Sequence, residues 1–319
     1  MGQNIVTEFG KVFNMTYYSI ADLIVSIDAG HVTLQKELKD FEISKPDRQC
    51  DIDISFDFSG EDLKYVFKFQ QKETWIMTAP LLNIFEKPDS FVVLYKYPKL
   101  VYGYEVFKST NKAVIYFNTA EIDGADTYDI KLEEHEAEDT TGPELLLYSV
   151  RDAFFFHAQK FGRIPIHSSS IIYKGKVYLF SASSGVGKTT HVSQWSNAEI
   201  EHSLFNGDVC MAYQKDGFVF AGALPWSGTS NCYTAKDYPL GGVIFIQRGE
   251  INAINPLGLA DGAINLCARC LAPNWNRSLV SYNMDIIEEM IPKIITGKLQ
   301  CNISSEAAIV VRDFLEERR

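Results

Sequence analysis

Residues 179–191 read LFSASSGVGKTTH and could bind phosphate. Residues 182–189 match the phosphate-loop pattern G-x-x-x-x-G-K-[ST] with one change, because Ala182 stands in place of the first glycine. The backbone N–H groups of such a loop, and of the helix that follows, present positive dipole ends to phosphate. An apolar strand pattern precedes the loop and a helix-compatible segment follows it. The stretch therefore predicts a nucleotide-binding site.

The types of the loop residues assign their roles. Lys188 is predicted to reach the β- and γ-phosphates, and the Thr189 hydroxyl to ligate Mg²⁺. The first pattern position tightens the turn rather than contacting phosphate, so Ala182 fits unless it requires a positive φ. The predicted nucleotide-binding residues are Ser184, Gly185, Val186, Gly187, Lys188, Thr189 and Thr190.

A phosphate loop indicates a nucleotide but no particular reaction. The sequence lacks the N-K-x-D motif of GTPases, the L-S-G-G-Q motif of ABC-type ATPases, and the H-R-D and D-F-G motifs of eukaryotic-type protein kinases. The loop also leaves the donor open between ATP, GTP and pyrophosphate, because it contacts phosphates and not bases.

Further motifs surround the loop in a particular order. His167-Ser168 precedes it, and Asn206-Gly207-Asp208, LPWSGTSNCY and PLGGVIFIQRGE follow. This order resembles the C-terminal domain of HPr kinase/phosphorylase and its relatives in the phosphoenolpyruvate-carboxykinase-like P-loop fold, most closely a bacterial subgroup of HPr-kinase-related proteins. The resemblance covers residues 140–319. The first half of the chain resembles, more weakly, the strand-rich extension of that subgroup.

The resemblance implies a catalytic set of Asp208, His167 and Lys188, with Thr189 and Asp208 as metal ligands. Asp208 matches one member of the family's acidic pair, and His167 matches a histidine near the transferred phosphate. Gly207 departs from the family because it occupies the other acidic position. Either Asp208 must act as both base and metal ligand, or another residue supplies the second function. HPr itself is therefore not the expected acceptor.

The resemblance implies an ATP- and Mg²⁺-dependent kinase of the cytoplasm that phosphorylates a hydroxyl group. The acceptor would be serine of a peptide or protein, or a small molecule, and a homo-oligomer is compatible with the family. The alternative is a nucleotide-binding regulatory or scaffold protein of a peptide-modification system that transfers no phosphate. Two features motivate that alternative: Asp208 is the one carboxylate where the family has two, and Ala182 replaces the first glycine of the loop.

Several other residues have two interpretations. Trp226, Ser227 and Gly228 form a turn either at the mouth of the site or in an ordinary loop. Arg248 could reach an anionic substrate, although a solvated arginine is the simpler interpretation. Cys267 and Cys270 form a C-x-x-C without a second pair, so two small buried residues on a helix over 259–271 are expected rather than a zinc site.

The elements that must position these residues fall into two predicted domains, residues 1–139 and 140–319. The first reads as short strands rich in β-branched and aromatic residues, among them 16–28 and 64–70, which predicts an antiparallel sheet or a sandwich. The second begins with a helix predicted to end near Gly162. It then mixes strands over 166–173, 176–182, 201–208, 209–214, 217–223, 241–247 and 299–303, the first two joined by a turn at Lys174-Gly175, with helices after the loop and over 283–295 and 305–317. The predicted fold class is α+β, a β-rich N-terminal domain followed by an α/β P-loop kinase domain.

Composition limits the class of partner. The formal net charge of −11 argues against binding to nucleic acid or an anionic membrane, since phosphate-rich surfaces select basic proteins. No run of about 18 apolar residues occurs, so no membrane span is predicted. The 319-residue chain shows no signal peptide, and its six cysteines are expected to be reduced thiols in the cytoplasm.

Overall fold

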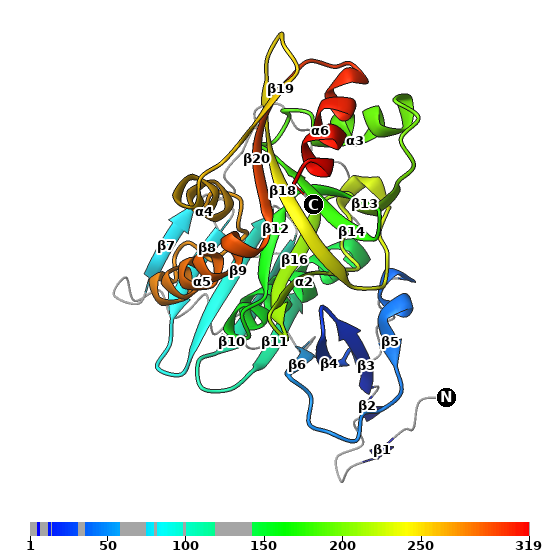
Figure 1. Ribbon diagram of the computed structural model, residues 1–319. Helices are drawn as coiled ribbons and strands as arrows, with labels where there is room; N and C mark the ends of the chain where they lie inside the picture. The colour runs from blue at the N-terminus through cyan, green and yellow to red at the C-terminus, as the bar shows by residue number, and fades with distance from the viewer. Residues whose placement is uncertain are drawn as a thin grey trace. The chain divides into compact units, whose positions relative to one another are not determined.

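The computed structural model describes residues 5–6, 12–13, 15–30, 36–57, 75–79, 82–97, 100–118 and 142–318. The chain forms two compact units, one built from residues up to His157 and the other from residues 158 onward together with Ile20–Asp22. The boundary predicted at 139/140 lies outside the described residues and stays a prediction. The described chain is mixed and strand-rich, in agreement with the α+β prediction (Figure 1).

The first unit contains a nine-stranded sheet in the order β5-β3-β4-β6-β11-β10-β9-β8-β7. The strands are β3 (Met15–Ile20), β4 (Leu23–Asp28), β5 (Glu42–Ile43), β6 (Ile52–Asp57), β7 (Trp75–Ala79), β8 (Leu82–Glu86), β9 (Ser90–Tyr97), β10 (Leu100–Phe107) and β11 (Lys112–Asn118). A short pair, β1 (Ile5–Val6) with β2 (Val12–Phe13), and the 3-10 helix η1 (Lys36–Phe41) complete its described elements up to residue 118.

The expected antiparallel sheet is wrong in one respect. Strand β6 runs parallel to both β4 and β11, so the sheet is mixed, and the described strands form one large sheet rather than a sandwich. The predicted strand over 16–28 is two strands, because Ala21 and Asp22 adopt positive φ angles of 50° and 61° and form a tight turn. The strand predicted over 64–70 lies outside the described residues.

Helix α2 (Gly142–Lys160) follows. It ends where the sequence predicted, since Gly162 adopts a φ of +70° and its N–H bonds the carbonyl of Gln159. This left-handed glycine after the last turn is a common helix terminator.

The second unit is built on a sheet in the order β12-β16-β17-β18-β14-β13-β15, with β20 also paired to β18 and β19 to β20. Its strands are β12 (Ile164–His167), β13 (Ser169–Tyr173), β14 (Lys176–Ser181), β15 (Ser203–Asn206), β16 (Val209–Lys215), β17 (Phe218–Gly222), β18 (Tyr238–Arg248), β19 (Ala253–Pro256) and β20 (Ile295–Cys301). Its helices are α3 (Lys188–Asn197), η3 (Gly228–Ser230), α4 (Leu259–Cys267), α5 (Arg277–Met290), η4 (Ile291–Lys293) and α6 (Glu306–Glu316).

Helices lie on both faces of this sheet. A Cβ on Gly262 of α4 would meet Thr296 at 3.1 Å, whereas a Cβ on Gly297 would meet the Phe314 ring of α6 at 3.0 Å. Because Thr296 and Gly297 are successive residues of β20, α4 and α6 cover opposite faces. Figure 1 shows α3 and α6 side by side over the β14-β18-β20 part of the sheet.

The main core of this unit lies beneath α3 and α6. It buries side chains of β13, β14, β18, β20 and both helices, including Tyr178, Phe180, Trp195, Val311 and Phe314. This core fixes the start of α3 against the end of β14, where the phosphate-loop residues lie.

Three local predictions in this unit are wrong. The strand predicted over 166–173 is split at Ser168, where β12 pairs with β16 and β13 pairs with β14 and β15. Helix α5 begins before residue 283, because the side chain of Asn276 accepts a bond from the N–H of Leu279 and caps it. It also ends before 295, where β20 starts.

The helix predicted over 259–271 ends at Cys267, and Cys270 pairs with Ile166 as an isolated bridge. Cys267 and Cys270 are both free thiols and partly buried, so they are not two buried residues of one helix. Burial raises the pKa of the Cys270 thiol to about 12. None of the described helices is both long and apolar enough to cross a membrane.

Candidate nucleotide-binding site

The loop between β14 and α3 turns at two glycines. Gly185 and Gly187 adopt positive φ angles of 74° and 116°, which side chains would disfavour. Ala182 is 3% exposed, packs into the main core, and is not among the residues with positive φ. Alanine at the first pattern position is therefore accommodated, as the sequence predicted.

The N-terminus of α3 lacks a side-chain cap. Gly187 is the N-cap residue, no side chain bonds the first turn, and that turn carries no acidic residue. The first N–H bonded back to Gly187 is that of His191, at 2.8 Å. The N–H groups before it have no intrahelical acceptor, so this end of α3 is suited to an anion.

Arg248, at the end of β18, contacts the loop. Its Nε donates to the carbonyl of Val186 at 3.2 Å, and its Nη2 donates to the carbonyl of Gly185. Because N–H and C=O point in opposite directions across a trans peptide, these bonds turn the N–H groups of Val186 and Gly187 away from Arg248. Arg248 is solvent-exposed, as the simpler interpretation expected, but its guanidinium also bonds the backbone of the loop, a contact that the sequence did not predict.

Lys188 is half-buried beside a second cation. Its Nζ lies 3.5 Å from the Ala182 carbonyl oxygen. Burial lowers the pKa of the Lys188 ammonium, the carboxylate of Asp208 opposes this shift, and the positive charge of Arg269 adds to it. Arg269 was not predicted as a site residue. Among the described residues its guanidinium has no hydrogen-bond or ion-pair partner, and with Lys188 it makes this region positive.

Asp208 lies in the tight connection between β15 and β16. The carbonyl of Asp208 accepts from the N–H of Ser168 at 2.9 Å, and Ser169 donates to the carbonyl of Gly207 at 2.9 Å. The side-chain oxygen Oδ1 of Asn206 accepts from the N–H of Asp208 at 2.9 Å. Buried serines and asparagine thus fix the backbone at the aspartate, while its side chain stays partly exposed.

His167 and Asp208 are brought together. The distance from Nδ1 of His167 to Oδ1 of Asp208 is 3.3 Å, and both side chains are 30% exposed. The backbone of His167 is held on both sides: its N–H donates to the carbonyl of Arg269, and its carbonyl accepts from the Ser181 hydroxyl at 2.6 Å. Thus β12, the end of β14 and the segment after α4 meet at His167.

The position of Gly207 has no room for a side chain. A Cβ there would lie 2.0 Å from Oγ and 2.4 Å from Cβ of Ser230. Ser230 is itself fixed, since it donates to the Ser227 carbonyl at 2.6 Å and accepts from the N–H of Cys232 at 3.2 Å. Glycine at position 207 is therefore enforced by the neighbouring loop.

The segment from Trp226 to Gly228 lies at the site rather than in a distant loop. A Cβ on Gly228, which has a φ of +57°, would be 3.0 Å from the side chain of Asp208. Trp226 is buried, and its carbonyl accepts from the Asn206 amide at 3.1 Å.

The remaining predicted ligands differ in exposure. Ser184, Thr189 and Thr190 are exposed, whereas Val186 packs partly against the main core. The described residues contain no cluster of three or more histidine, cysteine or acidic side chains suited to a metal. Mg²⁺ on nucleotides needs only one or two carboxylates beside phosphate oxygens, so an Asp208 carboxylate with a Thr189 hydroxyl fits this ion.

Comparison with known proteins gives little. No protein-family model and no curated protein matches the chain. One similar solved structure is the HPr(Ser) kinase/phosphatase from Coxiella burnetii, with 11% identity and a TM-score of 0.29 over 48% of this chain and 97% of that one.

Proposed function

We propose that the chain is an ATP- and Mg²⁺-dependent kinase that transfers the γ-phosphoryl group to a hydroxyl of a peptide, protein or small molecule. The observation that carries the proposal is the His167–Asp208 pair. The Asp208 carboxylate also interacts electrostatically with Lys188, which lies at the uncapped start of α3. A nucleotide site alone would need only the loop and the lysine.

The residues divide the work as follows. The N–H groups of the loop and Lys188 bind the β- and γ-phosphates, and Thr189 with Asp208 would hold Mg²⁺, which neutralises charge on those phosphates. The acceptor oxygen attacks the γ-phosphorus while the bond to the β–γ bridging oxygen breaks and ADP leaves. The hydroxyl proton passes to the His167–Asp208 pair, so His167 supplies the function that Gly207 cannot.

Gly207 favours a second function, nucleotide binding without phosphoryl transfer, since only one carboxylate stands where the resembling family has two. The two functions differ in their products. A kinase forms ADP and a phosphorylated acceptor together, whereas a binding protein forms neither.

Thermal unfolding with and without Mg·ATP, for the wild type and Lys188→Ala, tests the site first. At a nucleotide concentration of about 100 times Kd the wild type gains roughly 2.7 kcal/mol, and the variant loses most of this gain. ADP release with peptide and small-molecule acceptors then tests transfer. Absence of any shift at millimolar Mg·ATP would overturn both functions, and a shift without ADP would overturn the kinase alone.

A further inference from the structure

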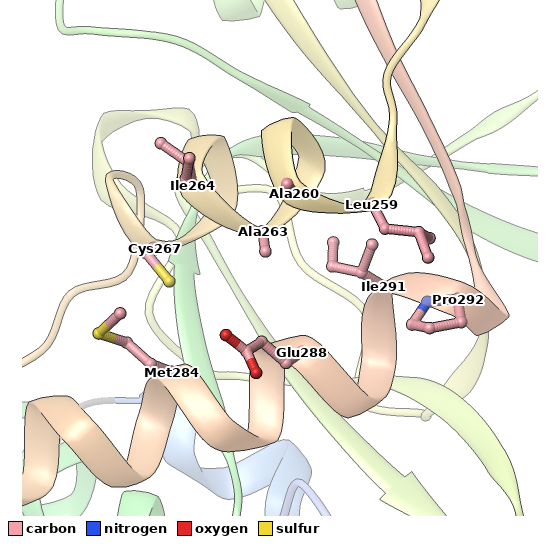
Figure 2. A pocket seen from close by; sticks show the side chains of 9 residues that line it. All are labelled: Leu259, Ala260, Ala263, Ile264, Cys267, Met284, Glu288, Ile291 and Pro292. Atoms are coloured by element: carbon pink, nitrogen blue, oxygen red, sulfur yellow. The ribbon is translucent and has the colours of Figure 1, made fainter.

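A pocket of about 530 Å³ lies between α4 and α5, outside the site described above. Figure 2 shows side chains of both helices and of the turn after α5 facing it. Its lining residues are Leu259, Ala260, Ala263, Ile264, Cys267, Met284, Glu288, Ile291 and Pro292. Eight of these nine side chains carry no charge.

The apolar walls of this pocket are open to solvent. Leu259, Ile264 and Met284 are 62%, 66% and 46% exposed. They are three of the eleven large hydrophobic side chains exposed in the described part of the chain. Exposed apolar side chains that gather around one pocket mark a site of interaction. Because small-molecule sites enclose most of their ligand, an open trough between two helices fits a peptide better.

The pocket has a negative charge at its centre. Figure 2 shows the Glu288 carboxylate rising from α5 toward Ala263 and Cys267. Within the described residues Glu288 has no hydrogen-bond or ion-pair partner. The two helices carry three further exposed acidic residues, Asp261, Asp285 and Glu289, of which Glu289 bonds the Gln214 amide, and no lining residue is basic. An occupant with an apolar face and one cation would complement both features.

We propose that this groove binds an apolar peptide segment that carries a lysine or arginine opposite Glu288. Given the proposed kinase function, on which the identity of this segment rests, the segment belongs to the phosphate acceptor, so the acceptor is a peptide or protein. An amphipathic helix with apolar residues at i, i+3, i+4 and i+7 would fill the trough between α4 and α5.

The backbone connects this groove to the candidate site. After α4 ends at Cys267, the carbonyl of Arg269 accepts from the N–H of His167 at 3.0 Å. The N–H of Leu271 then bonds the Pro165 carbonyl at 2.8 Å. The segment that leaves α4 is therefore paired with the strand that carries His167, and an acceptor docked on α4 would be held by the same element.

The test uses fluorescence anisotropy of a labelled peptide of about twelve residues, with leucine at the four spaced positions and one lysine on the same face. A matched peptide has glutamate in place of the lysine. We expect the full-length protein to bind the lysine peptide about fivefold more tightly, and Glu288→Lys to reverse this preference. Ile264→Glu should abolish binding of both, while Ile303→Glu, at a more exposed site elsewhere, should not.

Lys188→Ala separates this inference from the kinase. The variant should still bind the lysine peptide, although it loses the stabilisation by Mg·ATP. In the wild type, peptide binding without any stabilisation by Mg·ATP would support the groove and overturn the kinase. Equal binding of both peptides, or no binding at millimolar concentration, would overturn the groove. A wild-type dimer that dissociates in Ile264→Glu would also overturn the proposal, because a second copy of the chain would then occupy the groove.

Discussion

Nδ1 of His167 lies 3.3 Å from Oδ1 of Asp208, although the two residues belong to different strand connections. At this distance the carboxylate can orient the imidazole ring through Nδ1, which leaves Nε2 to face a substrate. Within the described residues, Nε2 of His167 has no hydrogen-bond partner and is available to an acceptor hydroxyl.

The first prediction concerns this pair. His167→Gln and Asp208→Asn should each lower the rate of ADP formation roughly 100-fold. The first variant removes the imidazole that accepts the hydroxyl proton, and the second removes the carboxylate charge beside it. The double variant should lose little more than the worse single variant. His167→Gln should keep the stabilisation by Mg·ATP. Strictly additive losses in ADP formation would show that the two side chains act separately.

The second prediction concerns Gly207. Gly207→Ala should cost about 1–3 kcal/mol of unfolding free energy, because its Cβ would overlap Ser230. In a Ser230→Gly background the same substitution should cost less than about 1 kcal/mol. Denaturant unfolding of the four proteins measures this coupling.

The Ser230→Gly background also permits Gly207→Asp, which restores the second acid of the resembling family. If the single carboxylate limits phosphoryl transfer, ADP formation should rise in this double variant. An equal cost of Gly207→Ala in both backgrounds would show that Ser230 does not enforce the glycine.

The sequence predicted the parts of this site that depend on local residues. The phosphate loop was predictable because glycines with positive φ, the lysine and the helix start lie within a few residues. The turn at Lys174-Gly175 was predictable for the same reason, and both residues have positive φ. Ala182 was correctly accepted because its backbone needs no left-handed conformation.

The parts that depend on distant residues were not predictable. Arg248 bonds Gly185 across 63 residues, and no pattern in one sequence shows that the ends of β14 and β18 lie together. Ser230 lies in the LPWSGTSNCY motif, but the sequence does not show that its side chain fills the space beside Gly207, so Gly207 could only be noted as a departure. The parallel direction of β6 against β4 was not predicted either, because it depends on the path of the chain between the two strands.

The third prediction concerns Arg248. Arg248→Gln should weaken the stabilisation by Mg·ATP by roughly 1 kcal/mol, about fivefold in affinity, because the loop carbonyls lose their charged donor. Arg248→Lys should not restore it fully, since an ammonium lacks the fork that reaches two carbonyls.

The matched control is Arg312→Gln, an exposed arginine paired with Asp313 on α6. It should leave the stabilisation by Mg·ATP at the wild-type value in the same thermal assay. Tighter nucleotide binding by Arg248→Gln would mean that Arg248 holds the loop in a conformation that opposes binding.

The fourth prediction concerns His191, which lies on α3 just after the loop. The side chain is 3% exposed, its Nε2 accepts from Nε1 of Trp195 at 3.4 Å, and its buried Nδ1 has no hydrogen-bond partner. Burial lowers the pKa of His191 from 6.5 to about 4. The imidazole therefore stays neutral in the folded protein under conditions that protonate it in the unfolded chain.

The sign of the pH effect follows. Above pH 6.5 the His191 imidazole is neutral in the folded and the unfolded chain, so it costs no stability. As the pH falls toward about 4, this imidazole takes up a proton only in the unfolded chain. Stability therefore falls by up to roughly 3 kcal/mol in this window and by no more below it. His191→Gln keeps an acceptor for Trp195 but cannot titrate, so its urea midpoint should fall less steeply between these pH values. Unfolding at pH about 8 gives the packing cost of the variant separately. An unchanged slope would place the acid sensitivity in other groups.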